Sequence, residues 1–238
     1  AIHGLFTFRG LGVAGSVIPM LRVKVRRIVE QHESVEGSYE HKSLMNAFNG
    51  LPVEFLFEAP DDVITELLEL SLKAGATGEF QSQIVMNPDA SSAFVFVVLP
   101  KAHYSDELRA GLQSVLQHHL RATYADHRVY LGKFGTVAVH FYLTTDATFA
   151  DIDLSTVERE LVTIGTPWTV RLREALLEAL GERQSAECYA KYSEAFSETY
   201  SEIVHPDDAV RDILRMDDVT RDQRVTFELL PSRSNPSQ

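Results

Sequence analysis

The feature that most constrains the fold is the longest uninterrupted apolar run in the chain, the seven residues Ala93–Leu99. It is apolar at both alternating sets of positions and ends at Pro100, which favours a central strand covered on one face by helices and partly shielded on the other. The apolar pair Ile84-Val85 precedes it, with a turn at Asn87-Pro88-Asp89 between the two. The sequence therefore predicts a hairpin.

Helical and strand patterns alternate after this hairpin. Ser105 is a candidate helix cap, and apolar residues recur behind it at spacings of 4, 3, 1 and 4, which predicts an amphipathic helix over 105–121. A second helix is expected over 153–164. The expected strands are 81–87, 92–99, 128–131 and 136–144. This pattern predicts an α+β fold, in which a four-stranded antiparallel sheet has helices on one face and helical segments on either side in the sequence.

Helical periodicity dominates both flanks. The expected helices are 17–30, one after Ser38, one from Asp61 to Gly75, 167–180, 184–196 and a short one from Pro206. Short strands are expected at Ile2–Phe8 and Val225–Leu230. We therefore divide the chain into 1–78, a mainly helical linker after the end of a preceding module; 79–165, the α/β domain; 166–222, a helical segment; and 223–238, the start of a further strand and a disordered tail.

Charge and composition exclude several classes of partner. Acidic residues outnumber basic ones by 34 to 22, a formal net charge of -12, so phosphate backbones and anionic membranes would repel the chain. We expect no nucleic-acid partner, and no membrane partner because the longest apolar run is far shorter than the about 20 residues of a membrane-spanning helix. The single cysteine, Cys188, and the lack of a secretory leader favour the cytoplasm. A start without Met is typical of a piece of a longer protein.

One motif suggests a dinucleotide cofactor. Gly10, Gly12 and Gly15 spell GxGxxG between an expected strand and an expected helix. In a dinucleotide-binding unit the helix starts inside the glycine loop, which would place Pro19 in the helix interior at a cost of about 3 kcal/mol. We interpret the helix as starting at Pro19 and the glycines as a flexible connection, so no cofactor-binding residue is expected.

The other candidate constellations also favour structural roles. His118 and His119 point to different sides of their helix, His140 is expected to be a hydrogen-bonded histidine within the sheet, and Cys188 a buried small apolar residue. The motifs GxSxG and GxxxxGK[ST] are missing from the sequence, as is HExxH. An aromatic stripe, Tyr189, Tyr192, Phe196 and Tyr200, is typical of core or partner packing. We therefore nominate no catalytic and no metal-binding residue.

Six segments together resemble one family in order and spacing: Gly4–Thr7, Ile18–Val25, His41–Leu44, Pro52–Phe57, Val97–Arg109 and Val137–Tyr142. Trp168 before an amphipathic helix and the stretch Tyr192–Tyr200 also fit. This series resembles the large bacterial NAD-dependent glutamate dehydrogenases over nearly all of residues 3–230. The likeness lies in the ordered series, since none of its motifs is specific alone.

The resemblance implies a non-catalytic piece of the N-terminal regulatory region, in which residues 79–165 form an ACT-like (ferredoxin-like) domain. The catalytic lysines, the substrate pocket and the NAD-binding domain of the parent would lie beyond Gln238. The parent would convert L-glutamate to 2-oxoglutarate and ammonia with NAD, and the piece itself would hold no cofactor. Its expected partners are the other domains and subunits of that enzyme.

ACT-like domains commonly bind amino acids where the first strand meets the first helix. For this chain the resemblance points to Lys101, His103, Tyr104 and Ser105 as an effector site for an amino acid. The alternative is a purely structural scaffold that joins domains or subunits and binds no small molecule. A free-standing enzyme is disfavoured by the lack of a convergent catalytic set.

Overall fold

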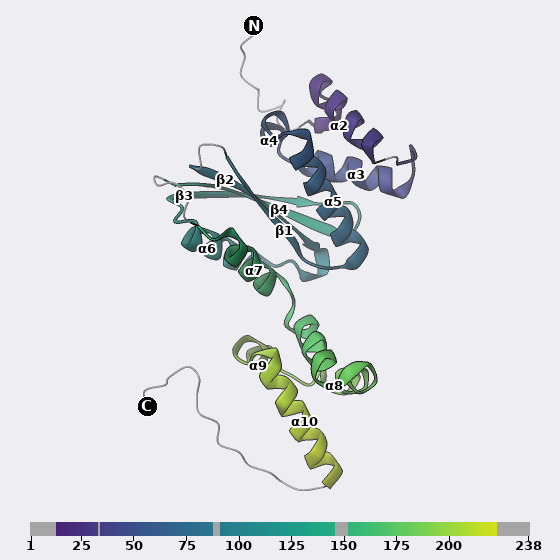
Figure 1. Ribbon diagram of the computed structural model, residues 1–238, viewed down its shortest axis with the longest axis vertical. Helices are drawn as coiled ribbons and strands as arrows, with labels where there is room; N and C mark the ends of the chain where they lie inside the picture. The colour runs from purple at the N-terminus through teal and green to yellow at the C-terminus, as the bar shows by residue number, and fades with distance from the viewer. Residues whose placement is uncertain (1–12, 33, 88–90, 146–151, 223–238) are drawn as a thin grey trace. The chain divides into compact units, whose positions relative to one another are not determined.

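The computed structural model describes residues 13–32, 34–87, 91–145 and 152–222, which divide after Thr166 into two compact units. Figure 1 shows their elements. The first unit contains η1 (Gly15–Val17), α2 (Pro19–Gln31), α3 (Tyr39–Gly50), α4 (Val53–Glu58), α5 (Asp61–Thr77), β1 (Gln81–Met86), β2 (Ser92–Pro100), η2 (Lys101–His103), α6 (Asp106–His119), β3 (Tyr124–Leu131), β4 (Thr136–Thr144) and α7 (Leu154–Gly165). The second contains α8 (Trp168–Tyr192), α9 (Glu198–Ile203) and α10 (Pro206–Asp222).

The four strands form one antiparallel sheet in the order β1-β2-β4-β3. Strand β2 is central, and its residues from Ser92 to Leu99 are all buried, as the apolar run predicted. It pairs with β4 in a register that places Val95 opposite Phe141 and Phe96 opposite His140. The α+β fold with a four-stranded antiparallel sheet is thus confirmed.

Helices cover both faces of this sheet (Figure 1). Val95, Val97 and Leu99 share one apolar cluster with α6 and α7, which form the expected layer. The alternate residues Phe94 and Phe96 share a second cluster with α2, α3, α4 and α5. Strand β2 is therefore buried on its second face as well and not partly shielded, because the helices before the sheet fold back onto it. The domain boundaries derived from the sequence stay predictions.

Several elements differ from the sequence-based expectation. Helix α5 passes through Gly75 and ends at Thr77, followed by Gly78 as its cap, whose left-handed backbone (φ 71°) glycine adopts without a side-chain clash. Strand β3 starts at Tyr124, earlier than expected, because pairing with β4 forms this mostly exposed edge strand without an apolar pattern. Helix α4 was not predicted, since its six residues are too few to show a helical period.

The second unit is a small helical assembly. Helix α8 starts at Trp168 as predicted, and it is broken at Gly181, where the backbone leaves helical geometry (φ 74°, ψ 173°). The indole N–H of Trp168 donates to the Val204 carbonyl oxygen at 2.8 Å. Trp168, Phe196 and Tyr200 pack ring against ring. The aromatic stripe of the sequence therefore serves the core of this unit, and Cys188 packs beside it, only partly buried.

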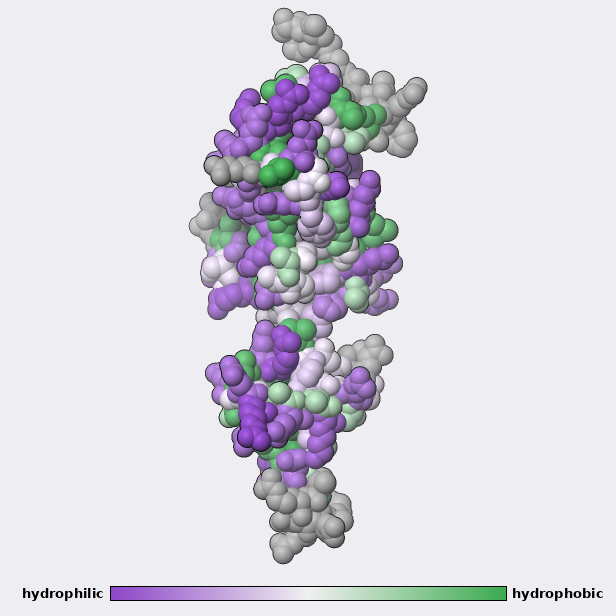
Figure 2. All heavy atoms as spheres, turned by 90° about the vertical axis from the view of Figure 1, so that its right-hand side faces the viewer, coloured by the Kyte–Doolittle hydropathy of each residue, from purple (hydrophilic) through white to green (hydrophobic). Residues whose placement is uncertain are grey.

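Several sequence-based expectations fall outside the described residues: the strands at Ile2–Phe8 and Val225–Leu230, the tail, most of the turn at Asn87-Pro88-Asp89, and Gly10 and Gly12. On the face shown in Figure 2, hydrophilic residues predominate and hydrophobic ones are scattered among them. None of the described helices combines the length and apolar character that a bilayer crossing requires.

Candidate functional site

The four effector-site candidates lie in the short connection between β2 and α6. Lys101 follows the last residue of β2, and its backbone N–H donates to the Gly135 carbonyl oxygen at 2.8 Å, which fixes this connection beside the β3–β4 turn. Its side chain is exposed and forms no ion pair with the residues that the structure describes. His103 is partly buried. The structure therefore keeps these residues together at one end of the sheet.

Two of the four candidates have structural partners. The Ser105 hydroxyl caps α6 by accepting the Leu108 backbone N–H at 3.1 Å. The Tyr104 hydroxyl donates to Asp106 Oδ1 at 3.1 Å. Partial burial, followed by this hydrogen bond, raises the pKa of Tyr104.

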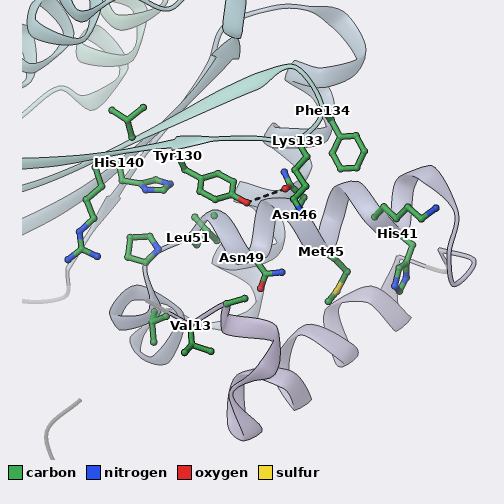
Figure 3. A pocket seen from close by; sticks show the side chains of 17 residues that line it. Val13, His41, Met45, Asn46, Asn49, Leu51, Tyr130, Lys133, Phe134 and His140 are labelled. Atoms are coloured by element: carbon green, nitrogen blue, oxygen red, sulfur yellow. Dashed lines mark hydrogen bonds between the residues drawn. The ribbon is translucent and has the colours of Figure 1, made fainter. Parts of the chain in front are cut away.

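A pocket lies on the other side of the sheet, between α3 and β3 (Figure 3). Its volume is about 700 Å³, and 17 residues line it. None of the four sequence-based candidates is among them. This pocket was missed at the sequence level, because its walls come from segments far apart in the chain.

Contacts between α3 and β3 set the shape of this pocket. The Tyr130 hydroxyl donates to Asn46 Oδ1 at 3.1 Å, the dashed line of Figure 3. At the end of α3, Gly50 lies so close to the Tyr130 ring that a Cβ atom would sit 2.6 Å from it. At the start of α3, the rings of Tyr39 and Phe134 meet edge to face at 5.1 Å. Helix α3 and strand β3 therefore run antiparallel along the pocket.

His140 lines the inner wall of the pocket from β4 and is only 4% exposed. Its ring stacks against Phe94 and Phe96, with centroids at 5.7 and 5.5 Å. Burial, reinforced by the positive charge of Arg128, lowers the pKa of His140 to about 3, so the imidazole is neutral at pH 7. Its Nε2 atom is buried without a hydrogen-bond partner, which corrects the expectation of a fully hydrogen-bonded sheet histidine. The same side chain borders a smaller neighbouring pocket of about 310 Å³.

The glycine motif has a packing role at its last position. A Cβ atom on Gly15 would lie 2.8 Å from Leu56 and 3.2 Å from Phe48, so glycine allows η1 to pack against α3 and α4. Helix α2 starts at Pro19, as the argument against the dinucleotide fingerprint required. The sheet that the structure describes is antiparallel throughout.

One histidine of the α6 pair has a structural partner. His119 Nε2 lies 2.6 Å from Glu160 Oε2, which joins α6 to α7. Within the described part of the chain, no three His, Cys, Asp or Glu side chains are grouped so that they could hold a metal ion.

Comparison with known proteins places this architecture in one family. Residues 18–73 match helical motif 1 of glutamate dehydrogenase, residues 83–169 match its ACT2 domain, and residues 175–219 match its helical motif 2. The NAD-specific glutamate dehydrogenase of Pseudomonas aeruginosa is 24% identical over 211 residues, and that of Halomonas elongata 25% over 214 residues. Each alignment covers 88% of this chain and 13% of the relative.

The fold and these matches define the chain as an ACT-like α+β domain preceded and followed in the sequence by helical motifs. The chain belongs to the large NAD-specific glutamate dehydrogenases, as the ordered series of segments indicated.

Proposed function

We propose that this chain is a non-catalytic regulatory and assembly segment of a large NAD-dependent glutamate dehydrogenase. The whole enzyme would convert L-glutamate to 2-oxoglutarate and ammonia with NAD, and this segment would contact its other domains and subunits. The proposal rests on the matches to three consecutive modules of that family. A cytoplasmic location is part of the same proposal, since the chain carries one cysteine in 238 residues.

The observation that carries the regulatory part is the packing of the first helical motif on the ACT-like sheet. Phe55 of α4 stacks on Phe94 of β2 with ring centroids 3.9 Å apart, and β2 carries buried residues on both faces. Because close-packed interiors transmit displacements between layers, movement of the helical layer would reach the end of β2 and the start of α6. A segment built in this way can relay binding at one place to a neighbouring module.

The amino-acid effector site at Lys101, His103, Tyr104 and Ser105 belongs to this proposal. The carboxylate of an amino acid would pair with the exposed Lys101 ammonium group. The scaffold alternative is favoured by a specific observation, because the Ser105 and Tyr104 hydroxyl groups already hold Leu108 and Asp106. A scaffold would use this connection only to cap α6 and to contact other modules.

The test uses the full-length enzyme and two single variants. Calorimetric titration with a panel of amino acids is expected to give saturable heat that Lys101→Ala weakens by about tenfold, the loss of one charged hydrogen bond. Lys73→Ala is the control, since Lys73 is an exposed lysine of α5 outside this connection. Heat no larger than dilution for every amino acid would reject the effector site and leave the scaffold.

Deletion of this segment from the full-length enzyme separates the two roles. Light scattering would report on assembly, and assays with and without amino acids would report on the regulatory response. Loss of the response is expected for a regulatory segment, whereas loss of assembly alone would favour the scaffold. Formation of NADH from glutamate by the isolated chain would contradict the non-catalytic assignment.

A further inference from the structure

The pocket between α3 and β3 is basic in a chain that is acidic as a whole. Its lining includes Lys42, Arg128 and Lys133, together with two histidines, and no Asp or Glu side chain. The chain carries 34 acidic and only 22 basic residues, so a 17-residue lining without a carboxylate is a marked local departure. A cleft lined by one sign of charge attracts ligands of the opposite sign.

Two of these cations have no ionic partner within the described residues. Lys42 lies in the first turn of α3 and Lys133 in the β3–β4 turn, and neither forms an ion pair or a side-chain hydrogen bond there. The contact between the Tyr39 and Phe134 rings brings these two segments together at the same end of the pocket. Arg128 lies toward the other end and faces Glu54 Oε1 at 3.6 Å.

The two asparagine side chains of α3 add further donors. Asn46 Oδ1 accepts the Tyr130 hydroxyl, and Asn49 Oδ1 accepts the Ser16 backbone N–H at 2.9 Å. A backbone N–H can only donate, so this contact fixes which end of the Asn49 amide is oxygen. With both oxygen atoms occupied, the NH₂ groups remain available among the described residues. The pocket thus presents mainly hydrogen-bond donors.

His140 supplies a donor at the inner wall. His140 is only 4% exposed, and its Nε2 atom has no hydrogen-bond partner among the described residues. Figure 3 shows the imidazole extending from β4 toward the Tyr130 ring, on the pocket side of the sheet. A buried polar atom without a partner is unfavourable, and a ligand acceptor would satisfy it. The neutral imidazole can do so by carrying its proton on Nε2.

We propose that this pocket binds a small organic anion whose carboxylate or phosphate groups pair with Lys42 and Lys133 and reach the donors of Asn46, Asn49 and His140. Its volume of about 700 Å³ suits such a ligand, since small-molecule pockets are typically about 300–1,000 Å³. The Tyr130 and Phe134 rings, which also line the pocket, would provide apolar contact for the carbon skeleton. The site is separate from the Lys101 connection and does not depend on the activity of the whole enzyme.

The experiment is calorimetric titration of the 238-residue chain with succinate, tricarballylate and inorganic phosphate. Succinamide is the uncharged counterpart of succinate. Saturable binding of one or more of the anions, without binding of succinamide, is expected. Carboxylates binding more tightly than phosphate, or the reverse, identifies which anionic group the pocket takes.

Variants locate the binding. The double variant Lys42→Ala/Lys133→Ala is expected to weaken it by about tenfold or more, because two charged contacts are lost. The control Arg22→Ala/Lys73→Ala removes the same charge from exposed positions of α2 and α5 outside the lining and should leave the affinity unchanged. Asn46→Asp keeps the acceptor for Tyr130 while placing a carboxylate in the pocket, so it should also weaken binding and still fold.

Three results would overturn the proposal. The first is no saturable binding of any of the three anions at millimolar concentration. The second is equal weakening by the pocket variant and by the control, which would mean binding to overall charge. The third is weakening by Lys101→Ala alone, which would move the ligand to the connection between β2 and α6 and support the effector site instead.

Discussion

The Tyr130 hydroxyl donates a 3.1 Å hydrogen bond to Asn46 Oδ1 across 84 positions of the sequence. It joins β3, an edge strand of the sheet, to α3 in the helical layer that covers one face. Gly50, one helical turn further along α3, gives the Tyr130 ring the room it needs. These contacts attach the first helical motif to the ACT-like sheet and form one wall of the basic pocket.

Tyr130→Phe should lower the free energy of unfolding by about 1 kcal/mol, because Asn46 loses its hydrogen-bond donor while the ring packing remains. Urea denaturation followed by far-UV circular dichroism measures this change. Tyr124→Phe is the control on the same strand, since Tyr124 is 54% exposed and its hydroxyl group bonds to none of the described residues. An equal loss in both variants would contradict a specific role for the bond to Asn46.

Gly165→Ala should destabilise the first unit by about 1–3 kcal/mol through overpacking. A Cβ atom at this position would lie 2.1 Å from the Phe80 ring, and Phe80 is itself buried in the core under α7. Thermal unfolding measures the effect.

Gly111→Ala provides the matched comparison in α6. Its Cβ atom would be in ordinary contact, 3.9 Å from Ile164, so the helix-favouring alanine should stabilise by about 0.5–1 kcal/mol. If both glycine variants changed the stability in the same direction, the close approach of Gly165 to the Phe80 ring would be contradicted.

The stability of the chain should fall on acidification partly because of His140. Its pKa is about 3 when folded, below the ordinary value of 6.5, so between these values the unfolded chain binds a proton that the folded chain does not. The free energy of unfolding is therefore unaffected by the titration of this group above pH 6.5. It decreases as the pH falls from 6.5 toward 3, by at most about 1.4 kcal/mol per pH unit. His140→Gln should show a shallower decline over this window in urea denaturation. Parallel profiles for the two proteins would contradict the lowered pKa.

Tyr200→Phe should destabilise the second unit by about 1 kcal/mol. The Tyr200 hydroxyl donates to Asp212 Oδ2 at 2.6 Å, and burial together with this bond raises the pKa of Tyr200. Trp168, the single tryptophan of the chain, packs against the Tyr200 ring, so its fluorescence reports on this unit during denaturation. Tyr130→Phe, which lies in the first unit, is the control and should leave the fluorescence transition unchanged.

Ser105→Ala should destabilise the first unit by about 1 kcal/mol through loss of the α6 cap. Ser105→Asp should retain stability, because aspartate is an equally good cap at a helix N-terminus. Thermal unfolding measures both. A stable Ser105→Ala chain would mean that the hydroxyl group is available for another role, as an effector site would require.

Local patterns were sufficient for the central part of the fold. The run from Ala93 to Leu99 is buried on both sides, so its apolar character marked it as the inner strand. Single residues also acted where the sequence indicated: α2 starts at Pro19, Ser105 caps α6, and Gly181 breaks α8. The first residues of strand β3 and the whole of helix α4 were not predicted, because β3 is largely exposed and α4 is only six residues long. The effector role of Lys101 and its neighbours stays a prediction.

What the sequence determined by itself was the set of elements and their apolar faces, since periodicity and caps depend on neighbours a few residues apart. Only the tertiary structure decided that α3 lies along β3, that His140 stacks between Phe94 and Phe96 with an unpartnered nitrogen, and that Lys42 and Lys133 both line one pocket. The physical reason is that an apolar face must be covered, but its own residues do not determine which distant segment covers it. Polar side chains that become neighbours through this tertiary packing are far apart in the sequence, so no local pattern indicates them.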